Sequence, residues 1–116
     1  MGRAAGGGQL ESDLQIACVS RVLQPLHARR VLKYFAVPNG GLRSSSEAAR
    51  MKKEGVVSGI HDLVIVGVPH LAYFIELKVA GGRIGDKQRE IHDEFEACGI
   101  PTFVCWTFDE FCSVIR

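Results

Sequence analysis

Two kinds of hydrophobic pattern alternate along the chain. Apolar side chains recur at three- and four-residue spacing between residues 10 and 26, which is typical of one face of a helix. Short apolar runs such as residues 31–37 and 101–106 are typical of buried strands. The pattern predicts helices over residues 10–26, 44–54, 86–98 and from Thr107 or Asp109 onward, and strands over 31–37, 62–67, 72–79 and 101–106.

Proline and glycine residues are expected to end several of these elements. Pro25 should limit the first helix, because its ring lacks the N–H that an interior helical position donates. Gly99 is placed as the C-terminal stop of the helix over 86–98. Three strands precede a helical crossover to a fourth, and this order predicts an α/β fold with a mixed four-stranded sheet flanked by helices.

The length of 116 residues suits one domain with one hydrophobic core. Residues 1–8 are small and glycine-rich, and we expect a disordered tail there, followed by a single domain over 9–116. The sequence has neither a membrane-length apolar stretch nor a secretory signal, which favours a cytoplasmic protein without a membrane partner. The four cysteines lack the spacing of a zinc site and are expected to be buried, reduced thiols.

The formal net charge of +1 hides an uneven distribution of charge. Residues 29–53 contain seven basic residues and one acidic residue, a net charge of +6, whereas residues 90–116 have a net charge of −5. The basic segment suits a face that binds a polyanion such as nucleic acid. A solvated charged surface would show the same pattern, and charge alone does not separate the two.

Three charged residues stand out because they lie at the ends of apolar runs. Asp62 opens one run, and Glu76 and Lys78 stand near the end of the next. On a strand the side chains of Glu76 and Lys78 leave the same face, while Leu77 points into the core. Burying charges at the rim of an apolar sheet costs desolvation energy, so packing alone rarely places them there. Two carboxylates with a lysine are the groups that a divalent-metal site for phosphoryl chemistry requires.

Six short motifs follow one another along the chain. They are Glu11–Gln15, Pro38–Arg43, Met51–Val56, Gly59–Leu63, Phe74–Lys78, and Gly82–Ile84 followed by Gln88 and His92. In this order they resemble the VRR-NUC domain, the virus-type replication-repair branch of the PD-(D/E)XK nuclease superfamily, over nearly the whole chain. The compact length resembles the small stand-alone phage and bacterial members, and the resemblance implies a restriction-endonuclease-like αβββαβ core.

The resemblance implies a catalytic site that acts with Mg²⁺ or Mn²⁺, cations that prefer oxygen ligands. Lys78 would orient the attacking water and stabilise negative charge on the phosphate. Gln88, early in the following helix, would support the site or contact DNA. The implied metal ligands, which complete the catalytic set, are Asp62, Glu76, Glu11 and the backbone carbonyl of Leu77.

The basic segment and the resemblance together suggest where DNA is bound. The sequence Asn39-Gly40-Gly41 is expected to form a turn. Backbone N–H groups and arginine side chains near such a turn suit phosphate oxygens. The residues expected to contact DNA are Asn39, Arg43, Lys52 and Lys53.

One residue departs from the usual pattern of the superfamily. The residue before the metal-binding aspartate is usually proline, and here it is His61. We expect His61 to be an exposed bystander, with a contact to DNA or an influence on the site as the alternative. His92, which follows Gln88 by four residues on the same helical face, is expected to pack structurally, with a supporting role in the site as the alternative.

The resemblance implies a metal-dependent DNA endonuclease that hydrolyses phosphodiester bonds. The small members suggest a homodimer that cleaves branched DNA such as four-way (Holliday) junctions, because a symmetric junction presents two equivalent strands to two sites. A role in DNA repair, at the nucleoid of a bacterial or phage-infected cell, is expected from the same resemblance. The alternatives are a flap, nicking or broad-specificity nuclease, and a non-catalytic DNA-binding module with the same fold.

Overall fold

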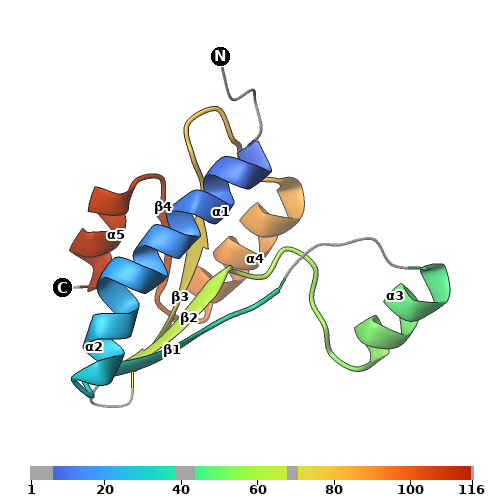
Figure 1. Ribbon diagram of the computed structural model, residues 1–116. Coiled ribbons are helices and arrows are strands. Elements are labelled where there is room, and N and C mark those ends of the chain that lie inside the picture. The colour runs from blue at the N-terminus through green and yellow to red at the C-terminus, as the bar shows by residue number, and fades with distance from the viewer. Residues whose placement is uncertain (1–6, 39–43, 68–70, 116) are drawn as a thin grey trace.

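The computed structural model describes residues 7–38, 44–67 and 71–115, and it confirms the predicted α/β fold (Figure 1). Residues 1–6 of the expected tail lie outside the described residues. Within the described ranges, no helix is long and apolar enough to cross a membrane. The elements in chain order are α1 (Gly7–Cys18), the π-helical segment η1 (Val19–Leu23), α2 (Gln24–Ala28), β1 (Leu32–Ala36), α3 (Ser45–Lys53), β2 (Leu63–Gly67), β3 (Leu71–Leu77), α4 (Asp86–Ala97), β4 (Thr102–Cys105) and α5 (Phe108–Ile115).

The strands form one mixed sheet in the order β1-β2-β3-β4. Both β1 and β3 pair antiparallel with β2, so that Leu63 stands opposite Ala36 on one side and Ile75 on the other. β4 runs parallel to β3, with Val104 opposite Glu76, because the chain crosses over through α4 between these two strands. Figure 1 shows α1 and α2 crossing one face of the sheet with α5 beside them, α4 on the other face, and α3 standing apart.

The prediction that Pro25 limits the first helix is wrong, since the chain continues helically through α2 to Ala28. The reason lies in η1, a wide π-helical turn after which the N–H of Gln24 bonds to the carbonyl of Val19. This turn shifts the hydrogen-bond register just before Pro25, which therefore stands in the first turn of α2, where a missing N–H costs little.

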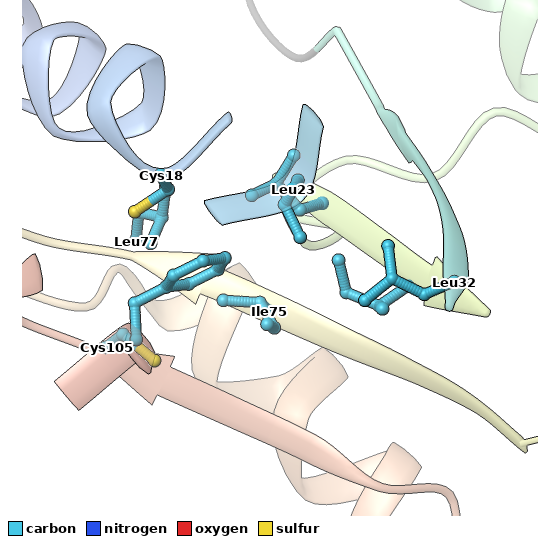
Figure 2. Packing of buried hydrophobic residues seen from close by; sticks show 9 residues of the cluster. Cys18, Leu23, Leu32, Ile75, Leu77 and Cys105 are labelled. Carbon is cyan, nitrogen blue, oxygen red and sulfur yellow. The ribbon is translucent and has the colours of Figure 1, made fainter. Parts of the chain in front are cut away.

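The hydrophobic core lies between the sheet and the helices that cross it. Figure 2 shows Cys18 of α1 beside Leu77 of β3, and Leu23 of η1 above the sheet. All four cysteines are free thiols, but the expectation that they are buried holds only for Cys18 and Cys105, since Cys112 is half-buried and Cys98 is exposed just after the end of α4. The buried members of the core are Cys18, Leu23, Leu32, Leu63, Ile65, Ile75, Leu77, Cys105 and Phe111.

The loop before β2 packs tightly on the start of α4 because Gly59 has no side chain. Gly59 has a φ of 78°, in the left-handed region that favours glycine. A Cβ atom at this position would lie 2.9 Å from the carbonyl carbon of Lys87 and 3.0 Å from the backbone nitrogen of Gln88. The absence of a side chain therefore fixes how closely α4 approaches the loop that leads into β2.

We predict that Gly59→Ala lowers the free energy of unfolding by about 2 to 4 kcal/mol, because left-handed strain adds to the displacement of α4. The matched control is Gly99→Ala, since Gly99 has a φ of 75° but a Cβ atom there would meet no described atom within 4 Å. The control should show the strain alone. Urea denaturation of both variants measures the difference, and equal losses would show that the close approach carries no cost.

Candidate active site

Asp62 is held at the junction of three strands by its own backbone. It directly precedes β2, where its N–H donates to the carbonyl of Ile75 at 3.0 Å and its carbonyl accepts from the N–H of Val37 at 2.9 Å. The carboxylate oxygen Oδ2 accepts a hydrogen bond of 2.7 Å from the N–H of Leu77. The side chain of Asp62 is therefore bound to the end of β3, next to the other charged residues.

Glu76 is a carboxylic acid inside the protein, with 4% of its surface exposed. Its partner is Gln88 in the first turn of α4, whose amide orientation is fixed at both ends. The Oε1 atom of Gln88 accepts from the N–H of Gly85 at 2.9 Å, and its Nε2 atom donates to Oε2 of Glu76 at 2.7 Å. The crossover helix thus reaches back to the strand that precedes it and holds one oxygen of Glu76.

Lys78 follows β3 directly and is 7% exposed. Its backbone N–H donates to the carbonyl of Cys105 at 3.0 Å, which extends the pairing of β3 with β4 by one residue. The Nζ atom of Lys78 lies 3.9 Å from Oε2 of Glu76. Because residues 76 and 78 leave the same face of the strand, the ammonium and the carboxyl group lie side by side in a nearly dry environment.

Glu11 of α1 stands at the open side of this group. It lines a pocket of about 410 Å³ with Asp62 and Leu77, together with other residues of the first helical segment. A Cβ atom at Gly82 would lie 3.5 Å from Oε2 of Glu11, so the turn after β3 leaves room for this side chain. The structure therefore brings Glu11, Asp62 and Leu77 to one pocket, although they are far apart in the sequence.

Burial and mutual repulsion raise the pKa values of the carboxyl groups. Desolvation is the main cause for Glu76, and the negative charge of Asp62 adds to it, which raises the pKa of Glu76 to about 8. Desolvation also raises the pKa of Asp62, although the hydrogen bond from Leu77 and the charge of Lys78 oppose it. The pKa of Glu11 is raised by partial burial, with Lys78 lowering it and Asp62 raising it. Without a cation, these three carboxyl groups therefore hold their protons more tightly than carboxyl groups in water do.

A sequence model of the VRR-NUC domain matches residues 12–108. The chain belongs to the VRR-NUC domain family. Two similar solved structures are described as "VRR_NUC domain" and "VRR_NUC domain protein". The first has a TM-score of 0.63 and 20% identity, over 90% of this chain and 92% of that chain. The second has a TM-score of 0.54 and 28% identity, over 71% of this chain and 63% of that chain. No match is found among curated proteins.

Membership in the VRR-NUC family makes this chain a nuclease domain of the PD-(D/E)XK type, a hydrolase with DNA as its substrate. The first solved structure shares only 20% of its residues with this chain, so its similarity shows the fold alone. Asp62, Glu76 and Lys78, which the sequence resemblance suggested as a D…ExK pattern, lie together where β2 begins and β3 ends. The sequence pattern and the three-dimensional arrangement therefore agree on one location.

The carboxyl groups of this VRR-NUC domain suit a small, hard cation that keeps several water ligands. Within the described residues, no three side chains of His, Cys, Asp or Glu lie close enough together to enclose a metal ion. Mg²⁺ needs no such cage, because one or two carboxylates are completed by waters and substrate phosphate oxygens. A divalent cation would also relieve the charge that raises the pKa values of Asp62 and Glu76. The donor set fits Mg²⁺ or Mn²⁺.

Of the four residues expected to contact DNA, only Lys52 and Lys53 lie within the described part of the chain. Asn39 and Arg43 lie outside the described residues. Lys52 and Lys53 are exposed in the last turn of α3. Lys52 also lines a groove of about 740 Å³, which Lys87 of α4 lines from the other side. The groove thus extends from α3 to the first turn of α4, where Gln88 contacts Glu76.

The expectation that His61 is an exposed bystander is wrong. Its side chain is 2% exposed, and its ring centroid lies 4.9 Å from that of Phe95 on α4. Burial is the main reason that the pKa of His61 falls to about 4, with a smaller contribution from His92, so the ring is neutral near pH 7. Its Nε2 atom is hydrogen-bonded to the hydroxyl of Thr102, a residue that sequence reasoning missed. The available signal for His61 was its place two residues before a buried strand, whereas Thr102 looks like any strand threonine.

We predict that the metal-free protein loses stability as the pH rises from about 6.5 to about 8. The unfolded chain releases the proton of Glu76 near the ordinary pKa of 4.5, whereas the folded state keeps it up to a pKa of about 8, so Glu76 makes the free energy of unfolding fall with rising pH. The lowered pKa of His61 has the opposite effect between about 4 and 6.5, because the unfolded chain binds the extra proton there, and the net fall is therefore expected above about 6.5. Urea denaturation in EDTA across this range measures the slope.

The decisive comparison for this pH dependence is Glu76→Gln, which removes the titration and keeps the shape of the side chain. The variant should show a flatter profile and be more stable than the wild type at the alkaline end. Glu94→Gln, at an exposed position on α4, is the control and should follow the wild type. An unchanged slope in Glu76→Gln would assign the pH dependence to another group.

Proposed function

We propose that this nuclease domain is a metal-dependent DNA endonuclease that hydrolyses phosphodiester bonds at Asp62, Glu76 and Lys78. The observation that carries the proposal is the buried Glu76, which lies between the Nζ atom of Lys78 and the amide of Gln88. An acidic group in this place destabilises the fold when no cation is bound. Its presence is explained by a cation that the chemistry needs.

Asp62 and Glu76 would hold the divalent cation in this mechanism, and the carbonyl of Leu77 could add a further oxygen. When bound, Mg²⁺ or Mn²⁺ polarises the phosphate and lowers the pKa of a coordinated water. Glu11 lines the same pocket as Asp62 and Leu77, and from there it would reach the cation or the waters around it. Gln88 keeps the Oε2 atom of Glu76 in one orientation.

Lys78 acts on the reacting groups themselves. Its ammonium orients the attacking water and stabilises the negative charge that develops on the phosphate. The oxygen of the water bonds to phosphorus as one P–O ester bond breaks, which leaves a phosphate end and a hydroxyl end. The nearly complete burial of Lys78 strengthens this electrostatic effect, because water screens the ammonium poorly there.

The substrate that we propose is branched DNA, such as a four-way junction, cut by a homodimer. Two identical strands of a symmetric junction match two sites related by a two-fold axis, and each site makes one cut. Support comes from membership in the VRR-NUC family and from the exposed Lys52 and Lys53, which suit the DNA backbone. Asn39 and Arg43 are proposed as further backbone contacts. Sedimentation velocity of the free and junction-bound protein tests the dimer.

We predict that Glu76→Gln and Lys78→Met each lower the cleavage rate by about 100-fold or more while DNA binding stays near that of the wild type. Glutamine keeps the shape of the carboxyl group, and methionine keeps the apolar stem of the lysine. The assay compares a labelled four-way junction, a flap and a linear duplex in Mg²⁺, Mn²⁺ or EDTA. Lys33→Met, at an exposed position on β1, is the control and should cut normally.

The pattern of cutting separates the proposed function from its alternatives. Metal-dependent cleavage of the junction alone supports a junction nuclease, and cleavage of all three DNAs reduces the proposal to a broad-specificity nuclease. Cleavage of the flap alone identifies a flap nuclease. Binding without cleavage in either metal would identify a non-catalytic module with the same fold. Unchanged turnover in either variant would remove that residue from the mechanism.

We predict that Lys52→Ala weakens binding to all DNAs and lowers the slope of log Kd against log salt by about 1, because one phosphate contact is lost. Fluorescence anisotropy across a series of salt concentrations, with Ca²⁺ or EDTA to prevent cleavage, measures the slope. Lys33→Ala removes the same charge from β1; Lys33 belongs to the basic segment but is not one of the four residues expected to contact DNA, so the slope should stay unchanged. A slope equal to that of the wild type would show that Lys52 does not contact a DNA phosphate.

A further inference from the structure

His61 begins a chain of hydrogen bonds that leaves the active site on the side of α4. The imidazole lies against Phe74 and Phe95, with ring centroids 5.7 and 4.9 Å away. Its Nε2 atom is hydrogen-bonded to the hydroxyl of Thr102 on β4, which is 8% exposed. The peptide link to Asp62 makes the position of this ring a direct constraint on the backbone that carries a catalytic carboxylate.

The chain of hydrogen bonds continues from Thr102 to the helix. The hydroxyl of Thr102 lies 3.3 Å from Nδ1 of His92, and Nε2 of His92 lies 3.5 Å from a carboxylate oxygen of Glu96. The side chain of Glu96 is largely exposed, so this contact brings the network from the buried His61 before β2 to the surface. It connects β2, β4 and α4, which are distant in sequence.

The directions of the two hydrogen bonds follow from the inner end. The Nδ1 atom of His61 is buried and has no hydrogen-bond partner among the described residues. A bare buried acceptor costs less than an orphaned buried N–H, so the proton of the His61 ring lies on Nε2. Nε2–H of His61 therefore donates to the hydroxyl of Thr102, and this hydroxyl donates to Nδ1 of His92.

Two contacts four residues apart fasten the same face of α4 to the sheet. Gln88 reaches Glu76, and His92 reaches His61 through Thr102. A shift of the helix at His92 would therefore also move the amide of Gln88 relative to Glu76. At the same time, the position of His61 limits the freedom of Asp62.

We propose that His61, Thr102 and His92 are positioning residues that fix Asp62 and α4 relative to each other. The network acts on the reaction through Asp62 and through the contact of Gln88 with Glu76, and it touches neither DNA nor the reacting atoms. The proposal rests on the proposed nuclease function, because the carboxylates that it aligns are those of the cleavage site. Outer hydrogen-bond partners of this kind typically change activity by about 10- to 100-fold.

The test removes only the hydroxyl group of Thr102. Thr102→Val keeps the volume and should lower kcat for the preferred DNA by about 10-fold or more, with KM little changed. Thr102→Ser restores the hydroxyl and should restore kcat. Thr107→Val is the matched control, because the hydroxyl of Thr107 accepts from the N–H of Glu110 in α5 and takes no part in the network. The control should lose stability and keep kcat.

Nitrogen-15 chemical shifts of the histidine rings in the full chain test the network without turnover. We expect His61 and His92 both to be protonated on Nε2, and we expect Thr102→Val to shift both signals. A proton on Nδ1 of His61 would overturn the directed network, and a kcat for Thr102→Val equal to that of the wild type would overturn its positioning role. If the wild type cuts no DNA, the proposed function fails, and the ring signals then decide this inference alone.

Discussion

The burial of the Glu76 carboxyl group is the constraint on which the rest of the site depends. An acidic group with 4% exposure must find partners inside the protein, because water no longer solvates it. Gln88 donates to one of its oxygens and Lys78 supplies a nearby positive charge. These partners come from the crossover helix and from the end of the same strand, so the pairing of β3 with β4 and the placement of α4 are both tied to one carboxyl group.

The electrostatic cost of this arrangement explains its chemistry. Desolvation and the charge of Asp62 raise the pKa of Glu76 to about 8. Without a metal ion, the two carboxyl groups of Glu76 and Asp62 therefore hold one proton between them at neutral pH. A divalent cation and a proton therefore compete for the same oxygens. The fold accepts this unfavourable charge density because the sheet and α4 hold the groups in place, which is a common relation between stability and function at active sites.

Helix α4 connects the cleavage site with the hydrogen-bonded network behind it. Gly59 allows its first turn to approach the loop before β2, Gln88 reaches Glu76, and His92 joins the hydrogen-bonded chain to His61. Helical periodicity could predict that residues 88 and 92 share a face. It could not predict their partners, because Thr102 lies on a strand that follows the helix and looks ordinary in the sequence.

The sequence by itself determined the elements, the mixed sheet and the cluster of Asp62, Glu76 and Lys78, since strand periodicity and the D…ExK spacing are local properties of the chain. Tertiary structure alone decided that Glu11 joins the pocket of Asp62, that Pro25 continues a helix after a π-helical turn, and that His61 is buried. The reason is physical: burial and hydrogen-bond partners are set by segments that meet across the sheet, and a local pattern carries no information about which distant residue will fill that space.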